Sequence, residues 1–368
     1  MTRIENSHLR TWIEVDTPAV AHNYRRFRQF LGSRVKLMAV VKSNGYGHGL
    51  VPFAKLLSAL GTDWLGVDSM VEARRLREEG IKLPILVLGY TRPAFYREAA
   101  RLGVALTISS GESLIQLLTS NFQPLIHLKV DTGMHRQGFL FADFKKLLPK
   151  FKLLKLQGIY SHLAASDGKS RAATQAQIKE FGKFLVLISK QHLIKHLAAT
   201  GGAIACPEAR FDLVRIGLGL YGLWPNKSLR RRFGSKINLR PALTWRTVIS
   251  EIKILPAGGR VGYDLTERVK PGTKLAVCPV GYWHGYPRAL SGSGRVLIKN
   301  QWAKVIGRVS MDMIVIDVTK VKNLQVGEEV TLLGGRSGPP AEDLARLAQT
   351  SNYEIITRLN PLIERFYC

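Results

Sequence analysis

Residues 36–49, KLMAVVKSNGYGHG, place a lysine where it could form a Schiff base. An apolar run, Leu37 to Val41, ends at Lys42 and passes directly into a loop with three glycines. A short β-branched run bounded by turn residues is typical of a buried strand, and a lysine at the carboxyl end of a barrel strand lies at the cavity mouth. Partial loss of water there favours the neutral, nucleophilic amine. The plainer interpretation is a strand-ending lysine that extends into solvent.

The loop after this lysine favours the chemical interpretation. Gly45, Gly47 and Gly49 flank Tyr46 and His48. Glycines allow the backbone to approach a ligand closely, because no Cβ stands in the way. We therefore expect a ligand beside this loop.

Other polar residues follow the ends of other predicted strands. These are Lys129, Asp131 and Arg136 in LKVDTGMHRQGF, His162 and Asp167 in YSHLAASD, Thr200 in AATGG, and Arg215 and Gly217 in VRIGLGLYG. Any one of them could be a core histidine, a helix cap or a buried ion pair, but their shared position favours one site. Hydroxyl and backbone N–H donors after the last two barrel strands are suited to a phosphate.

The element pattern that must position these residues is a (β/α)₈ TIM-type barrel. Short apolar runs alternate with helix-length segments such as Met70–Glu79 and Ala173–Lys190. The runs are Leu37–Val41, Trp64–Val67, Ile85–Leu88, Ala105–Ile108, Leu125–Val130, Leu156–Tyr160, His196–Ala199 and Leu213–Ile216. A doubly wound α/β sheet is the competing interpretation, but eight strand candidates without a break favour closure.

After Pro225 the pattern changes to short strands separated by Gly, Pro and Asp, typical of an all-β domain. The strand candidates are Thr244–Ile254, Lys274–Val280, Arg295–Ile298, Ala303–Val309, Ile314–Val318 and Glu329–Leu333, and helical patterns follow at Pro340–Gln349 and Tyr353–Leu359. Asn226–Asn238 is expected to be a linker. We predict a barrel domain over residues 1–235 and a C-terminal β-strand-rich domain over 236–368; a first strand at Thr11–Val15 could pack with the latter.

Composition excludes some functional classes. The 368 residues are 46% hydrophobic, which allows a sizeable core, and contain no apolar run long enough to span a membrane. Met1–Arg10 is polar and charged, without the apolar centre of a signal peptide, so a cytoplasmic protein is expected. Cys206, Cys278 and Cys368 are scattered without metal-type spacing, which indicates free thiols and no metal site.

The chain is strongly basic, with 54 Lys and Arg against 27 Asp and Glu and a formal net charge of +27. Such a charge attracts nucleic acids and anionic membranes nonspecifically. The basic residues are nevertheless spread along the chain, with short clusters such as Arg230–Arg232 and no basic tail or RNA-binding signature. We interpret them as a solvated surface that steers anionic ligands, and expect no dedicated nucleic-acid partner.

Residues 36–49 resemble the cofactor-lysine signature of the alanine racemases, which are pyridoxal 5'-phosphate enzymes with a barrel and a β domain. The resemblance extends in order from TWIEVD to NYEII, nearly the whole chain. It implies that Lys42 carries the cofactor as an aldimine and acts as one catalytic base. It also implies that Tyr46, Thr200 and Gly217 bind the phosphate, with Thr200 where serine is more usual, and that His162 lies near the cofactor ring.

By the same resemblance, Arg215 hydrogen-bonds the pyridine nitrogen. Arginine keeps its proton at working pH, so the ring would be a weaker electron sink and transamination would be suppressed. Arg136 is implied beside the cofactor's phenolic oxygen and the substrate. Lys129 matches a position that many members carbamylate. Asp167 is implied near the entrance.

In the second domain, GGRVGYDLT resembles the segment with the family's second catalytic base, here Tyr263. Racemisation needs one group on each face of a planar carbon. A phenol is a poor base at neutral pH, and the resemblance suggests His162 with Arg215 behind it as its partners. In the family this tyrosine comes from the other subunit, which implies a homodimer.

The remaining motifs are VGYWHGYPR, GRVSMDMIVIDV and SNYEII. By resemblance they supply substrate contacts at Met311 and Asp312 and entrance residues Tyr282, Arg288 and Arg308. They also supply Tyr353, a cofactor-binding residue that lines the channel beside the catalytic tyrosine. The chain departs from the family at His135, where a small residue is usual, and at Trp283 and His284, where small and acidic residues are usual. These departures concern the entrance more than the reaction.

The resemblance thus implies an alanine racemase that supplies D-alanine for peptidoglycan by a two-base mechanism. A serine or broad-specificity racemase keeps the cofactor and changes the substrate; Tyr353 near the substrate methyl argues for a small apolar side chain. A single-domain cofactor carrier shares the barrel but lacks Tyr263 and the β domain. A nucleic-acid-binding module is suggested only by the charge.

Overall fold

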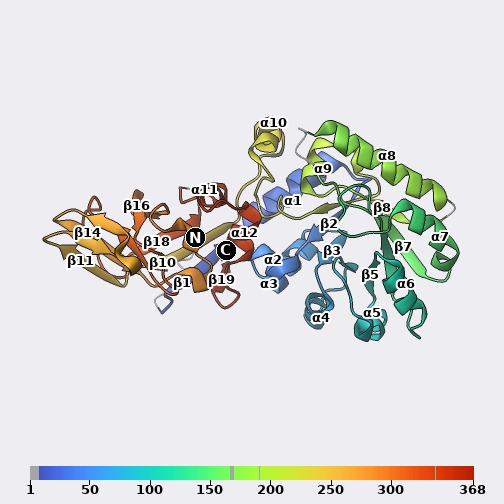
Figure 1. Ribbon diagram of the computed structural model, residues 1–368, viewed down its shortest axis with the longest axis horizontal. Helices are drawn as coiled ribbons and strands as arrows, with labels where there is room; N and C mark the ends of the chain where they lie inside the picture. Colours follow the sequence, from blue (N-terminus) through green and yellow to red (C-terminus); the bar gives the residue numbers. More distant parts are fainter. Residues whose placement is uncertain (1–7, 166–169, 190, 336) are drawn as a thin grey trace. The chain divides into compact units, whose positions relative to one another are not determined.

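The computed structural model describes residues 8–165, 170–189, 191–335 and 337–368, which form two compact units (Figure 1). One unit consists of Ala21–Gly45 and Leu50–Arg240. The other consists of the described residues up to Val20, the short loop Tyr46–Gly49, and Pro241–Cys368. The glycine-rich loop therefore divides: Lys42 belongs to the first unit, and Tyr46 to the second.

The first unit is built on eight parallel strands in the order β8-β7-β6-β5-β4-β3-β2-β9. Their bounds are β2 Lys36–Val40, β3 Trp64–Val67, β4 Ile85–Val87, β5 Val104–Ile108, β6 Leu125–Lys129, β7 Lys155–Tyr160, β8 Ile194–His196 and β9 Leu213–Ile216. A bridge between Ala199 and Arg215 brings the two edges together, so the sheet is a nearly closed barrel. The predicted barrel is confirmed.

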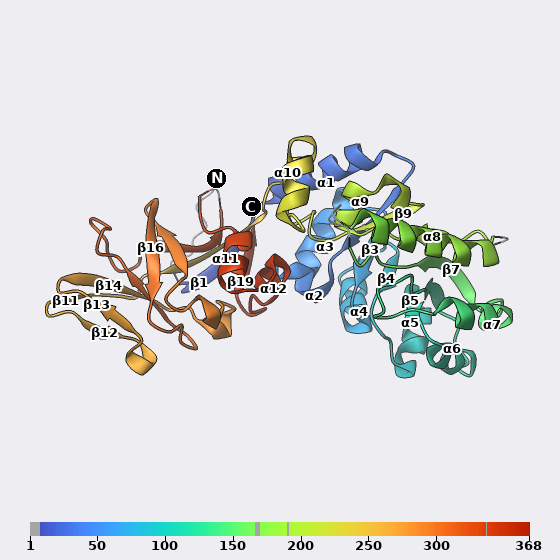
Figure 2. The same ribbon diagram turned by 45° about the horizontal axis from the view of Figure 1, so that its top comes forward.

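Helices surround this barrel, as Figures 1 and 2 show. They are α1 Thr17–Leu31, α3 Leu50–Ala59, α4 Met70–Glu78, α5 Tyr96–Leu102, α6 Gly111–Leu118, α7 Phe141–Phe151, α8 Arg171–Leu187, α9 Thr200–Ala205 and α10 Lys227–Ile237. Buried side chains of Met38, Trp64, Leu86, Ala105, Tyr160 and Leu213 form a cluster drawn from six strands. The barrel is therefore filled, and it leaves the polar residues at the strand ends to form a site.

The second unit is the predicted strand-rich domain. Its nine-stranded sheet has the order β11-β14-β17-β16-β15-β18-β10-β1-β19, and β12 and β13 form a separate hairpin. The bounds are β1 Thr11–Val15, β10 Leu243–Val248, β11 Glu251–Leu255, β12 Gly259–Val261, β13 Glu267–Val269, β14 Thr273–Cys278, β15 Arg295–Ile298, β16 Gln301–Ile306, β17 Ile314–Asp317, β18 Glu329–Gly334 and β19 Glu364–Tyr367, with helices α11 Ala341–Leu347 and α12 Asn352–Thr357. The first strand, β1, pairs with β10 and β19.

The predicted linker at Asn226–Asn238 is wrong, because this segment forms helix α10. The Asn226 side chain caps the helix by accepting from the Leu229 amide, and Asn238 ends it in the left-handed conformation. Leu229 and Ile237 are buried eight residues apart, on one face. The cap and this apolar face outweigh Gly234, which alone costs about 1 kcal/mol in a helix.

The predicted single strand Thr244–Ile254 is two strands. Up to Val248 the chain pairs with β18, whereas from Glu251 it pairs with β14. One continuous apolar pattern cannot show that the partner strand changes.

In the described part of the chain, no helix combines the length and the apolar character needed to cross a lipid bilayer.

Candidate active site

Lys42 begins a turn of left-handed helix directly after β2. The segment drawn as α2, Lys42–Tyr46, has φ/ψ of 56/53° at Ser43, 55/46° at Asn44 and 59/42° at Gly45. A left-handed helical conformation costs about 1–2 kcal/mol for each residue other than glycine. Such strain persists where the surroundings hold it, most often at functional sites.

Two acidic side chains hold this turn. Glu72 accepts from the amides of Asn44 and Asp68, and the Asn44 side chain in turn accepts from the Leu50 amide. The Lys42 ammonium lies 3.1 Å from an Asp68 carboxylate oxygen. The turn therefore fixes the direction of the lysine side chain, which is partly exposed at the carboxyl end of its strand.

Arg215, on β9, is almost fully buried and nearly saturated with acceptors. Its Nη1 donates to Nδ1 and to the carbonyl of His196, and its Nη2 donates to the Ser161 and Leu197 carbonyls and to His162 Nδ1. Burial lowers the pKa of Arg215 to about 10, so the guanidinium remains charged at neutral pH. Its Nε–H has no acceptor among the described residues, which leaves one directed donor for a ligand.

His162 is neutral at physiological pH. Burial, together with the charges of Arg215 and Arg136, lowers its pKa to about 3. Because Arg215 can only donate, His162 Nδ1 must accept, and the ring proton lies on Nε2.

Lys129 ends β6 inside the barrel, with its amine directed to Gln137 Oε1 at 2.8 Å and over the ring of Tyr160. Burial and the neighbouring charges of Arg215 and Arg136 lower its pKa to about 8. An amine with that pKa is neutral in a substantial fraction of molecules at pH 7–8.

The barrel site carries an excess of positive charge. Lys42, Lys129, Arg136 and Arg215 all lower the pKa of His162, so their charges act on one region. Asp68 pairs with Lys42, and Asp131 only partly offsets the lowered pKa of Lys129. A cluster of this kind suits a ligand with several negative charges.

The loop that carries Arg136 is built around Asp131. Its Oδ1 accepts from the amides of Gly133, Met134 and His135, and these bonds outweigh burial and lower the pKa of Asp131. His135 has a φ of 54°, and its ring lies 3.6 Å from the same carboxylate. The departure at His135 is thus an exposed side chain that pairs with the residue organising the loop.

The predicted phosphate residues Thr200 and Gly217 are in contact. The Thr200 hydroxyl oxygen accepts from the amides of Gly217 and Gly219, so its own proton is available to a ligand. The Gly217 N–H, predicted as a phosphate donor, is instead directed to Thr200. A ligand would have to share this N–H or displace the threonine.

Tyr46 packs within the other unit, against the Tyr353 ring at a centroid distance of 6.2 Å. The loop that carries Tyr46 lies close to α12: a Cβ on Gly47, whose φ is 84°, would be 1.9 Å from the Ile356 carbonyl oxygen. Arg365 Nε donates to the Gly47 carbonyl. Only glycine fits at this position.

Tyr263 starts the short 3₁₀ turn η3, Tyr263–Leu265, and 69% of its side chain is exposed. Gly262 before it has a φ of 80° and lies close to the Arg308 backbone. Arg308 pairs with Asp264 at 2.6 Å. The predicted base and the predicted entrance arginine therefore lie on neighbouring loops.

A third loop joins these two. The Tyr282 amide donates to the Ser310 carbonyl, and the Trp283 amide to that of Met311. His284 is buried, and its Nδ1 accepts from the Gly281 amide, so the departure at His284 closes its own turn, whereas Trp283 is exposed. Of the other predicted residues, Asp312 follows Met311, Arg288 begins η5 at Arg288–Leu290, and Asp167 lies outside the described residues.

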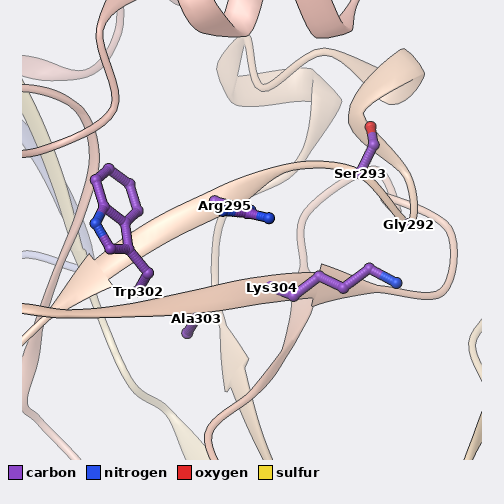
Figure 3. Close-up of a pocket in the computed structure, with 6 residues that line it drawn as sticks. All are labelled: Gly292, Ser293, Arg295, Trp302, Ala303 and Lys304. Atoms are coloured by element: carbon purple, nitrogen blue, oxygen red, sulfur yellow. The ribbon is translucent and has the colours of Figure 1, made fainter.

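A separate hollow of about 360 Å³ lies on the hairpin of β15 and β16 (Figure 3). Gly292, Ser293, Arg295, Trp302, Ala303 and Lys304 line it. None of these is a predicted site residue, so this hollow is not the site indicated by the sequence.

Sequence reasoning missed His127, His196 and Tyr160, which lie behind Arg215. His196 receives a hydrogen bond from Arg215 and stacks on the Tyr160 ring at 4.6 Å. A signal was present for His127, since it stands two residues before Lys129 on β6 and residues two apart share a strand face. His196 begins a predicted run, and only the closed barrel shows that it meets Arg215.

The known proteins that resemble this chain agree with the geometry. Residues 15–225 match the family described as alanine racemase, N-terminal domain, and residues 242–367 match alanine racemase, C-terminal domain. The chain belongs to the alanine racemase family. The predicted family, and with it the prediction of an enzyme of this family, is confirmed.

Two alanine racemases show how far the similarity extends. That of Halothermothrix orenii is 36% identical over 369 residues, covering 97% of this chain and 96% of the relative, and that of Symbiobacterium thermophilum is 37% identical over 370 residues, covering 97% of each. Among solved structures, the Clostridium difficile alanine racemase has a TM-score of 0.92 at 30% identity, covering 98% of this chain and 96% of that one. The Bartonella henselae enzyme, solved with covalently bound pyridoxal phosphate, has a TM-score of 0.88 at 26% identity, covering 98% and 100%.

Proposed function

We propose that the protein interconverts L- and D-alanine with pyridoxal 5'-phosphate held on Lys42, and that the D-alanine feeds peptidoglycan synthesis. The observation that carries the proposal is the set of donors at the carboxyl end of the barrel. Lys42, Lys129, Arg136 and Arg215 act on one half-buried histidine, His162, and the Nε–H of Arg215 has no acceptor among the residues that the structure describes.

The residues present fit this cofactor. Arg215 has one unused donor for an unprotonated ring nitrogen, and the Thr200 hydroxyl has a free proton for a phosphate oxygen. The net positive charge suits a phosphate and a phenolate. Lys42, held by the left-handed turn, supplies the amine for the aldehyde, and must leave Asp68 to do so.

When bound, the cofactor withdraws electrons from the substrate α-carbon and so acidifies its proton. Lys42 would take that proton from D-alanine, and Tyr263 would take it from L-alanine on the opposite face. When one group removes the proton from its own face, the other donates a proton to the opposite face, which inverts the centre. Arg215 keeps its own proton, so it would leave the ring nitrogen of a bound cofactor unprotonated and would suppress transamination.

Lys129 is proposed to carry a carbamate. Its neutral amine can add to carbon dioxide and lose one proton to water, since burial lowers its pKa to about 8. The resulting anion would replace a cation beside Arg136 and Arg215 and would hold Arg136 toward the substrate carboxylate.

The active form is proposed to be a homodimer in which Tyr263 enters the barrel of a second copy. The three neighbouring loops of the β unit expose large apolar side chains: Tyr263, Leu265, Tyr282, Trp283, Met311 and Met313. Large apolar side chains exposed on neighbouring loops are typical of a protein interface.

Absorbance spectra of the protein with added pyridoxal phosphate test the cofactor, and D/L analysis of alanine and serine incubations tests the reaction. Lys42→Ala should lose the visible cofactor–lysine band. Lys36→Ala, at the exposed opposite end of the same strand, should keep it. Tyr263→Phe should keep the band and lose most racemisation, whereas Tyr90→Phe, which alters an exposed tyrosine of the barrel unit, should keep both.

A band with faster racemisation of serine than of alanine would overturn the substrate assignment. A band without any racemisation would reduce the protein to a cofactor carrier. If Lys42→Ala kept the band, the lysine would be an ordinary strand end and the proposal would fall.

A further inference from the structure

The barrel wall is deformed around His127. Strand β7 pairs with β6 through a bulge: Ile126 faces Leu156, but His127 faces Gly158, so Gln157 is the extra residue. A Cβ on Gly158 would lie 2.4 Å from His127 Nδ1. Bulges re-aim side chains near active sites, and here the bulge and the glycine together make room for one imidazole.

His127 ends a chain of hydrogen bonds that starts at Arg215. Arg215 Nη1 lies 2.8 Å from His196 Nδ1, and His196 Nε2 lies 2.8 Å from His127 Nδ1. Burial lowers the pKa of His127 to about 3 and that of His196 well below its usual value, so both rings are neutral.

The direction of this chain follows from its arginine end. Arg215 has no acceptor atom, so His196 Nδ1 must accept and its proton must lie on Nε2. That N–H then donates to His127 Nδ1, and the proton of His127 must also lie on Nε2. The Arg215 donor therefore determines the tautomers of both His196 and His127.

The His127 end of this series of hydrogen bonds lies toward the amino ends of the barrel strands, opposite the candidate site. The side chain of Gln157 is the neighbour that partly offsets the lowered pKa of His127, although His127 Nε2 and Gln157 Oε1 lie beyond strict hydrogen-bond geometry. Gln157 and Trp64 line a cavity of about 190 Å³, and the Trp64 ring packs edge-on against His127.

We infer that His127 is a positioning residue for racemisation, because it accepts from His196 and so keeps His196 Nδ1 open to Arg215. Without that acceptor, His196 is left with a buried, unpaired N–H. The ring can relieve this by moving its proton to Nδ1, where it would face the Arg215 donor. Arg215 would then lose one of its five acceptors, and the direction of its Nε–H would be held less firmly.

Histidine ¹⁵N NMR of the cofactor-free protein tests the tautomers without any reaction. The chain has nine histidines, and single His→Asn variants assign the signals. At pH 7 both His127 and His196 should be neutral with the proton on Nε2. A charged ring, or a proton on Nδ1 of either one, would overturn the inference even in a fully active racemase.

Two nearly isosteric variants test the positioning role, and this part rests on the proposed function. Asn places an acceptor near the Nδ1 position of histidine, whereas Leu of similar volume has none. His127→Leu should give His196 mixed tautomers, lower kcat about 10-fold to 100-fold with little change in KM for alanine, and raise transamination relative to racemisation; the size follows other residues that orient a ligand-holding group. His127→Asn should restore most of kcat and the Nε2 tautomer of His196.

Equal loss of kcat in both variants would show that His127 acts only by packing, and would overturn the inference. So would an unchanged kcat and transamination ratio in His127→Leu. If the wild-type protein proved to have no racemase activity, the proposed function would fail, while the tautomer measurement would still decide the hydrogen-bond chain.

Discussion

Gly158→Ala should destabilise the barrel strongly, because Gly158 lies beside the bulge of β7 that makes room for His127. The new Cβ would lie 2.4 Å from His127 Nδ1, 2.5 Å from its Cε1 and 2.8 Å from the Ile194 carbonyl oxygen. The ring would have to move by about 1 Å to reach van der Waals contact, which breaks its 2.8 Å bond to His196. Overpacking costs about 1–3 kcal/mol and a buried unpaired donor about 1–3 kcal/mol. We expect a loss near 4 kcal/mol, or about 10 °C in the thermal midpoint of the barrel transition.

Differential scanning calorimetry of the cofactor-free protein measures this loss. The matched control is Gly182→Ala in α8, where a Cβ would meet nothing within 4 Å; its midpoint should stay equal or rise slightly, because alanine favours helix. In a His127→Ala background, Gly158→Ala should cost less, since the ring that it strikes is gone. A midpoint for Gly158→Ala within about 2 °C of wild type would refute the argument that this glycine exists to house His127.

Three further results are expected. Gly47→Ala should weaken pyridoxal phosphate binding and lower the thermal midpoint of the β unit, because its Cβ would meet the Ile356 carbonyl at 1.9 Å; titration and calorimetry measure the two effects, and unchanged values would contradict the close packing. With ¹³C-labelled bicarbonate at pH 8, a carbamate signal should appear that is lost in Lys129→Ala but kept in Lys145→Ala, an exposed control; its persistence in Lys129→Ala would assign it elsewhere. In carbon dioxide-free buffer, the unfolded chain keeps the proton of Lys129 up to about pH 10.5, whereas the folded chain releases it near pH 8. Because the unfolded chain binds more protons in this window, the free energy of unfolding should rise with pH across it. A Lys129→Met variant should lose that rise.

The sequence predicts the barrel well because its strands are short apolar runs that end in polar residues of the candidate site. Lys42, Thr200 and Arg215 follow or end such runs, and the fold brings Arg215 to His162 and Thr200 to Gly217. Closure of a parallel barrel makes this outcome general, since the carboxyl ends of all strands meet at one pole.

The sequence could not show features that depend on backbone conformation or on register. The sequence KSNGY does not predict left-handed φ/ψ angles at Ser43 and Asn44, since among these residues glycine is the one that favours them intrinsically. The β7 bulge follows from the need to fit His127, a residue far away in sequence. The helix at Lys227–Ile237 is hidden by its charges, because its apolar side has few members.

The electrostatics of the barrel site explain why its cationic side chains need both hydrogen-bond acceptors to hold them and an anion to offset their charge. Lys129 and Arg215 lie inside a low-dielectric barrel, and Arg215 lowers the pKa of Lys129. Carbonyl and imidazole acceptors stabilise Arg215 without removing its charge, so the repulsion between the cations remains in the cofactor-free protein. A phosphate, a phenolate or a carbamate reduces that repulsion wherever it binds. The hydrogen bonds through His196 to His127 therefore act with the carbonyl acceptors to orient Arg215, whereas the anions determine how strongly its charge destabilises the site.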